Sequence, residues 1–202
     1  VDKNKYLDYV MGCQPIILGY ADPDVNKAVI NQLELGSTFS LMNKLEVDVT
    51  ELLIDKIPCA ESARFGKNGA DVTTAAVRVA RAVTGRDHIA YCGYHGWHDW
   101  YIGSTSMNNG VPKNTKKDTV NFEYNNIDSL KKLFKKFKIA GVILEPLSMN
   151  LPKNNFLKEV QKLCKKNKTV LIFDEICTGF RVSMGGAQKL YGVIPDLTTL
   201  GK

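Results

Sequence analysis

The chain has 202 residues, of which 44% are hydrophobic and 24% charged, with a net charge of +6. This composition is ordinary for a globular protein and excludes intrinsically disordered, collagen-like and low-complexity classes. No apolar run approaches the roughly 18–20 residues that span a bilayer, and the polar residues 1–5 do not resemble a signal peptide, so we expect no membrane partner.

Hydrophobic periodicity predicts alternating helices and strands along the chain. The predicted helices cover residues 22–35, 43–57, 71–83, 127–137 and 155–166. The predicted strands cover residues 63–66, 88–92, 140–144 and 169–173. The strands are apolar throughout rather than alternating, as in parallel strands covered on both faces. We therefore expect an α/β domain, a mainly parallel sheet flanked by helices, with its ligand at the carboxyl ends of the strands.

The positive charge is nearly all lysine, concentrated in residues 131–138 and 153–168. In the first segment, leucine and phenylalanine recur at helical spacing and lysine fills the other positions, which favours a surface helix with a solvated face. Nucleic-acid sites favour arginine and exposed aromatic residues, and residues 131–138 contain no arginine. We expect no nucleic-acid partner.

The cysteines and histidines do not form a metal or disulfide pattern. The five cysteines are irregularly spaced and none belongs to a CxxC pair, which favours a reducing cytoplasm. His95 and His98 are two candidate ligands without a strong third one, so we expect no metal.

Two loops after predicted strands could bind a ligand. Residues 64–71 lead through a glycine-containing turn into a helix, whose N-terminus suits an anion, although an ordinary tight turn is equally compatible. Residues 93–100 gather aromatic and imidazole rings between two glycines. One of these rings could stack on a flat ligand, or the rings could pack the loop onto the domain.

Carboxylates follow two further strands. Glu145 ends one of them, where it could face a ligand or cap the next loop. Asp174 directly follows four apolar strand residues, and a buried carboxylate needs a partner such as a cation or a protonated ring nitrogen. Lys202 follows the apolar stretch 197–200, where a partly desolvated amine could form a Schiff base.

Taken together, these motifs resemble the class III (fold-type I) pyridoxal-phosphate aminotransferases, and most closely the glutamate-1-semialdehyde 2,1-aminomutase group. The resemblance covers essentially the whole chain. It rests on these segments, in order: Leu18-Gly19-Tyr20-Ala21-Asp22-Pro23, Thr84-Gly85-Arg86, Tyr94-His95-Gly96, Asp174-Glu175-Ile176, Thr178-Gly179-Phe180-Arg181, Gly185-Gly186-Ala187-Gln188, Pro195-Asp196-Leu197 and Gly201-Lys202.

The resemblance implies pyridoxal 5'-phosphate as cofactor and assigns roles to its catalytic residues. Lys202 matches the Schiff-base lysine, which also moves the substrate proton. Asp174 matches the carboxylate that keeps the pyridine nitrogen protonated. Tyr94 matches the aromatic residue on one ring face, and Ile176 matches the branched residue on the other.

Further cofactor-binding residues follow from the same resemblance. Gly69 and Ala70 match the phosphate-binding turn, His95 shapes the aromatic loop, and Glu145 matches a carboxylate near the cofactor hydroxyl. The family's turn commonly reads NSGTEA, so Ala70 replaces a threonine. The lost hydrogen bond to a charged phosphate costs about 1.5–3 kcal/mol, and we expect weaker or rearranged phosphate binding.

The resemblance also implies that the chain is incomplete. Family members are roughly twice as long, so residues 1–202 match the cofactor-binding large domain without the small domain, and residues 1–40 match the start of an N-terminal segment. A homodimer is implied, and we expect the isolated 202-residue piece to turn over weakly or not at all.

Three functions are compatible with these residues. The first is amino-group transfer between an amine donor and an aldehyde or ketone. The second is an intramolecular aminomutase; the loop Tyr94 to Trp100 reads YHGWHDW where that group usually reads YHGHAD, which favours another substrate, such as an amino-sugar precursor. The third is a non-catalytic binding protein that keeps the fold, against which the presence of both Asp174 and Lys202 counts.

Overall fold

The computed structural model describes residues 2–202 and divides them into two bodies. The first consists of residues 2–49 together with Lys202. It contains α1 (Pro23–Leu35), which starts where the Asp22 carboxylate accepts hydrogen bonds from the next backbone amides and proline occupies the first turn. Helix α2 (Lys44–Lys56) begins in this body and runs into the second.

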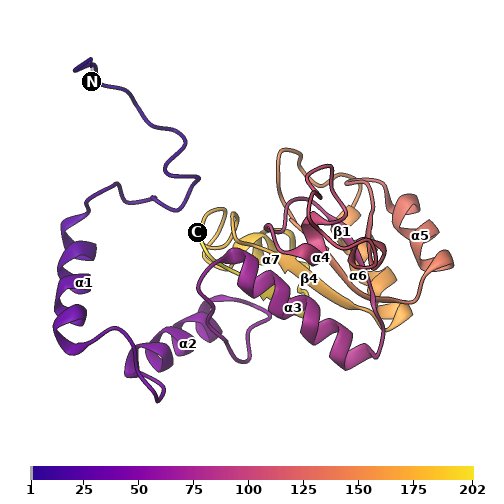
Figure 1. The fold of residues 1–202 in the computed structure, drawn as a ribbon, viewed down its shortest axis with the longest axis horizontal. Coiled ribbons are helices and arrows are strands. Elements are labelled where there is room, and N and C mark those ends of the chain that lie inside the picture. Colours follow the sequence, from indigo (N-terminus) through magenta and orange to yellow (C-terminus); the bar gives the residue numbers. More distant parts are fainter. Residues whose placement is uncertain (1) are drawn as a thin grey trace. The chain divides into compact units, whose positions relative to one another are not determined.

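The second body, residues 50–201, holds the sheet and its covering helices (Figure 1). Its helical elements are α3 (Gly69–Thr84), α4 (Asp99–Ile102), the 3-10 turn η1 (Thr115–Lys117), α5 (Ile127–Lys136), α6 (Phe156–Asn167) and α7 (Gly186–Tyr191). Its strands are β1 (His88–Cys92), β2 (Thr119–Asn121), β3 (Ile139–Leu144), β4 (Val170–Asp174) and β5 (Leu197–Thr199).

The five strands form one parallel sheet in the order β2-β1-β3-β4-β5. The register places Cys92 beside Leu144 and Asp174 beside Thr199, so the carboxyl ends of the strands share one edge. The predicted α/β class with a mainly parallel sheet is confirmed. This edge is where parallel sheets bind their ligands.

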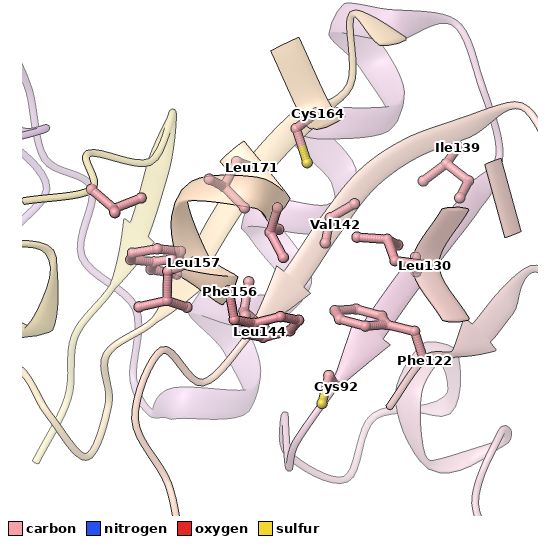
Figure 2. Close-up of a cluster of buried hydrophobic side chains, with 14 residues drawn as sticks. Cys92, Phe122, Leu130, Ile139, Val142, Leu144, Phe156, Leu157, Cys164 and Leu171 are labelled. Carbon is pink, nitrogen blue, oxygen red and sulfur yellow. The ribbon is translucent and has the colours of Figure 1, made fainter. Parts of the chain in front are cut away.

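Two hydrophobic clusters cover the two faces of the sheet. On one face, Leu130 of α5 and Leu157 of α6 pack on Val142 and Leu171 of the central strands (Figure 2). On the other face, residues of α3 and α4 pack on alternate strand residues such as Ile143. The continuous apolar runs seen in the sequence are therefore explained by burial on both faces.

The lysine-rich segments form the outer sides of α5 and α6. The two helices contact each other and point their apolar residues at the sheet. The lysines are exposed, among them Lys132, Lys135 and Lys166. The predicted surface helix with a solvated lysine face is confirmed.

Some predicted elements differ from the structure. Residues 63–66 form no strand; Arg64, Phe65 and Gly66 are exposed, and a run this short gains little by pairing. Strands β2 and β5 and helices α4 and α7 were not predicted, because each is six residues or shorter and shows no clear period. Among residues 2–202, no helix has the length and apolar character needed to cross a membrane.

Candidate functional site

Asp174 lies at the carboxyl end of β4 with a side chain that is 4% exposed. Its Oδ2 lies 2.7 Å from His95 Nδ1, and the other ring nitrogen, Nε2, lies 3.2 Å from the Cys92 carbonyl oxygen. Because a carbonyl oxygen can only accept, the contact with Cys92 is a hydrogen bond when Nε2 carries the ring proton. Asp174 therefore has a fixed, hydrogen-bonded orientation.

The second carboxylate oxygen of Asp174 is held by groups that follow in sequence. Oδ1 accepts hydrogen bonds from the Ile176 amide and the Thr199 hydroxyl, each at 3.2 Å. The parallel pairing of β4 with β5 places Thr199 beside Asp174. Nothing in the sequence pattern pointed to Thr199, because this contact depends on strand register.

The predicted phosphate turn forms the N-terminus of α3. The Asn68 side chain caps the helix by accepting a hydrogen bond from the Asp71 amide at 3.1 Å. A β-carbon on Gly69 would lie 2.6 Å from the Ile176 Cδ1 atom, so glycine lets the turn lie against this side chain without displacing it. The first amides of a helix lack partners within the helix and favour an anion. The turn thus places an anion-binding helix end beside the residues that follow Asp174.

The loop after β1 packs against this turn. A β-carbon on Gly96, which has φ +98°, would lie 2.7 Å from the Ala70 β-carbon. The Thr73 hydroxyl lies within hydrogen-bond distance of two carbonyl oxygens, those of Ala70 and His95. The loop and the helix are therefore fixed to each other at the point where Ala70 replaces the threonine of the related turn.

Tyr94 and Glu145 form a second contact in the same loop. The Glu145 carboxylate accepts a hydrogen bond from the Tyr94 amide at 3.0 Å. The Tyr94 ring is 62% exposed and meets the ring of Tyr101 edge to face, with centroids 5.7 Å apart. Burial raises the pKa of Tyr101 to about 12, so its hydroxyl stays protonated and donates to the Gly93 carbonyl oxygen. The Tyr94 side chain therefore stays largely accessible at the edge of the sheet.

His98 forms a polar cluster with α3 that sequence reasoning did not identify. The Thr74 hydroxyl donates to the Ala70 carbonyl oxygen, and it accepts from Trp100 Nε1 at 2.9 Å. His98 Nδ1 lies 2.8 Å from the same hydroxyl, and its Nε2 lies 3.7 Å from the Asp71 carboxylate. The second half of the aromatic loop is thus also fixed to the first turns of α3.

The second body therefore brings together most of the residues that the resemblance selected. These are Gly69, Ala70, Tyr94, His95, Glu145, Asp174 and Ile176. Lys202 directly follows Gly201, and Gly201 lies against Ile176. Lys202 itself is assigned to the first body, and the residue is exposed. Among the described residues, no group of three potential metal ligands lies together.

Comparisons with known proteins identify the class. The family model for class-III aminotransferases matches residues 1–202, and the chain belongs to this family. It is 43% identical to the 3-aminobutyryl-CoA aminotransferase of Cloacimonas acidaminovorans, covering 100% of this chain and 50% of the relative. It is 42% identical to the glutamate-1-semialdehyde 2,1-aminomutase of Archaeoglobus fulgidus, covering 100% of this chain and 52% of that protein.

Solved structures agree with the sequence comparison. An omega-transaminase from Sphaerobacter thermophilus is similar with a TM-score of 0.88 and 32% identity, covering 97% of this chain and 50% of that one. A transaminase with pyridoxal phosphate bound is similar with a TM-score of 0.89 and 28% identity, covering 97% of this chain and 50% of that one. The expected family is confirmed, and at the level of the family so is the expected cofactor. The chain spans about half the length of the curated relatives it matches.

Proposed function

We propose that the protein transfers an amino group between an amine donor and an aldehyde or ketone, using pyridoxal phosphate. The observation that carries this proposal is the buried Asp174 carboxylate at the ligand-binding edge of the sheet, hydrogen-bonded to His95 and adjoining the N-terminus of α3 through Ile176 and Gly69. An acidic group near an anion-binding helix end suits a ligand that has both a basic ring nitrogen and a phosphate.

The residues present fit this cofactor. The turn at Gly69 is so close to Ile176 that a β-carbon would fill the space, and the helix amides of the turn suit the phosphate. Tyr94 offers a largely exposed aromatic side chain, and Asp174 offers a fixed carboxylate. Ala70 supplies no hydroxyl, so phosphate binding relies on backbone amides in this turn.

Each residue has a definite task in the proposed reaction. The bound cofactor supplies an electron-accepting ring that takes up the electron pair released when the substrate C–H bond breaks. The Asp174 carboxylate would hold a proton on the ring nitrogen, and His95 keeps that carboxylate oriented. The Lys202 amine would hold the cofactor and would take the substrate proton at Nζ and return it.

An intramolecular aminomutase is the second candidate, because it would use the same residues. The Archaeoglobus relative carries that name, whereas the Cloacimonas relative is named for transfer on a 3-aminobutyryl thioester. Trp97 and His98 stand where the aminomutase loop reads His and Ala, which supports a substrate other than that of the aminomutases. Two assays distinguish the candidates. A transaminase needs both an amine donor and a carbonyl acceptor, whereas an aminomutase converts a single substrate without a second one.

We also propose a homodimer in the cytoplasm. The described part of the first body exposes many large apolar side chains along α1 and the start of α2, among them Val29, Leu33 and Leu45. Apolar surface on this scale marks an interface more often than solvent-facing protein. Light scattering on the complete gene product is expected to give twice the mass of one chain.

The proposed cytoplasmic location rests on the cysteines. Their irregular spacing supports a reducing compartment.

The proposed function is tested by cofactor binding to the complete gene product and its Lys202→Ala variant. After incubation with pyridoxal phosphate and borohydride, we expect the wild type to carry a permanent cofactor adduct, mapped to Lys202 by peptide mass spectrometry. The variant is expected to carry none and to lose turnover by several orders of magnitude, because the proton-transfer group is gone.

A wild-type protein without an adduct would contradict the enzyme function and favour a binding protein that keeps the fold. The isolated 202-residue chain serves as a third sample. Turnover equal to that of the complete product would contradict the expectation that these residues are only part of the working enzyme.

A further inference from the structure

Glu175 follows Asp174 directly but points its carboxylate into a different environment. The residue is only 1% exposed. Its oxygens accept hydrogen bonds from the Thr178 hydroxyl at 2.8 Å, from the backbone amides of Ala187 and Gln188 at 2.5 and 3.2 Å, and from the Gln188 side chain at 3.0 Å. All four donors lack a formal charge, so the buried carboxylate is stabilised by converging hydrogen bonds.

These donors belong to separate segments that Glu175 holds together. Thr178 lies in the turn after β4, whereas Ala187 and Gln188 lie in the first turn of α7. Gly186 has φ +69°, and a β-carbon there would overlap the Glu175 carboxylate, so glycine is required. The Gln188 side chain also accepts a hydrogen bond from the Cys59 amide at 2.9 Å. One carboxylate thus organises three stretches of chain.

The backbone of Glu175 is continuous with the candidate cofactor site. Its amide donates to the Thr199 carbonyl oxygen at 2.9 Å, directly after the β4–β5 pairing. Its neighbour Ile176 contacts both Gly69 and Gly201, and the Ile176 amide donates to Asp174. Any shift of residue 175 therefore moves the carboxylate on one side and the isoleucine on the other.

We propose that Glu175 is a positioning residue for the cofactor. Its hydrogen bonds with Thr178, Ala187 and Gln188 fix residues 174–176, and so hold the Asp174 carboxylate and the Ile176 side chain in the positions from which they would contact the cofactor ring. Glu175 itself does not touch the cofactor. The inference rests on the proposed function, because it deepens the account of that same site.

The test compares three variants of the complete gene product with the wild type. Glu175→Gln keeps the shape but places an NH2 group against backbone amides, and Thr178→Val removes one donor with little change in volume. Glu159→Gln is the matched control, because Glu159 lies on α6 and pairs with Lys162 at the surface. Three quantities are measured: the dissociation constant for pyridoxal phosphate, the pH midpoint of the bound cofactor's visible absorbance, and the melting temperature of the cofactor-free protein.

We expect Glu175→Gln to weaken cofactor binding at least about tenfold and to shift the pH midpoint, since loss of a hydrogen bond to a charged group is of this size. Thr178→Val is expected to do the same to a smaller extent, and Glu159→Gln to change neither quantity.

A lower melting temperature with wild-type affinity and an unchanged midpoint would overturn the proposal and leave Glu175 a purely structural role. If Glu175→Gln does not fold, the same two quantities in Thr178→Val decide. The wild-type sample distinguishes the two proposals. A wild type that binds no pyridoxal phosphate contradicts the proposed function, whereas a wild type that binds it and a Glu175→Gln variant that binds equally well contradict only the role of Glu175.

Discussion

At the scale of single residues, Gly96 and Ala70 form one of the close approaches in the site. Gly96 adopts φ +98°, and an added β-carbon would lie 2.7 Å from the Ala70 β-carbon and 2.9 Å from its α-carbon. Both the backbone conformation and the space therefore require glycine. This contact keeps the loop that carries Tyr94 and His95 against the first turn of α3.

We expect Gly96→Ala to lower the free energy of unfolding by about 2–4 kcal/mol, since it adds an overpacking cost to an unfavourable backbone conformation. Gly110 is the matched control, because it also has positive φ but no atom lies within 4 Å of its added β-carbon. Gly110→Ala should cost only about 1–2 kcal/mol. Urea denaturation measures both, and equal losses would contradict the role of the Ala70 contact.

Residue roles could be predicted from the sequence only where a motif marks them. Asp174 and His95 were selected by resemblance, but their hydrogen bond joins residues 79 positions apart and needed the folded sheet. Thr199 was missed because its contact with Asp174 depends on the register of β5. The roles assigned to Tyr94 and Lys202 remain predictions.

At the scale of elements, two helices share the same capping device in different places. The Asn68 side chain caps α3 at the predicted phosphate turn, and the Asn126 side chain caps α5 by accepting from the Ser129 amide at 3.2 Å. The two caps satisfy the same kind of orphan amide. Of these two caps, the α3 cap adjoins the candidate cofactor site and the α5 cap does not. Substitutions at the two caps therefore distinguish an effect on helix stability from an effect on ligand binding.

We expect Asn68→Ala and Asn126→Ala each to lower the free energy of unfolding by about 1 kcal/mol. Asn68→Ala should also weaken pyridoxal phosphate binding, because the cap shapes the turn whose amides would receive the phosphate. Asn126→Ala should leave binding unchanged. Thermal melts and cofactor titrations on both variants provide the comparison, and weaker binding in both would mean that the effect is global.

Long amphipathic helices and buried strands were well predicted because their period is strong. The helix predicted at residues 71–83 spans Gly69–Thr84, and the strand predicted at 140–144 spans Ile139–Leu144. The three-residue strands β2 and β5 carry no such period, and tertiary pairing alone defines them. The incorrect strand at 63–66 shows the converse, since a short apolar run without a neighbour stays irregular.

At the scale of the whole molecule, buried weak acids link stability to alkaline pH. Burial raises the pKa of the Cys92 thiol from 9.0 to about 12, and burial raises that of the Tyr101 hydroxyl from 10.0 to about 12. Between about pH 9 and pH 12, the thiol and the hydroxyl stay protonated in the folded protein, whereas they ionise in the unfolded chain. Stability is therefore fully present below about pH 9 and falls as pH rises toward 12.

We expect the free energy of unfolding to be insensitive to these groups up to about pH 9 and to decrease above it. Cys92→Ala removes one of these groups, so its stability should fall less steeply between pH 9 and 12 than that of the wild type. Chemical denaturation at a series of pH values gives both slopes. Identical slopes would show that Cys92 does not ionise differently in the two states.

The strand order also determines when the site can form. Asp174 is completed by His95, which precedes it by 79 residues, and by Thr199, which follows it by 25. A growing chain that has emerged only as far as β4 still lacks β5, and contacts between distant segments form slowly. The edge around Asp174 is accordingly completed only after Thr199 has been synthesised. A ligand that needs this edge would then bind chains that extend past β5 in preference to shorter nascent ones.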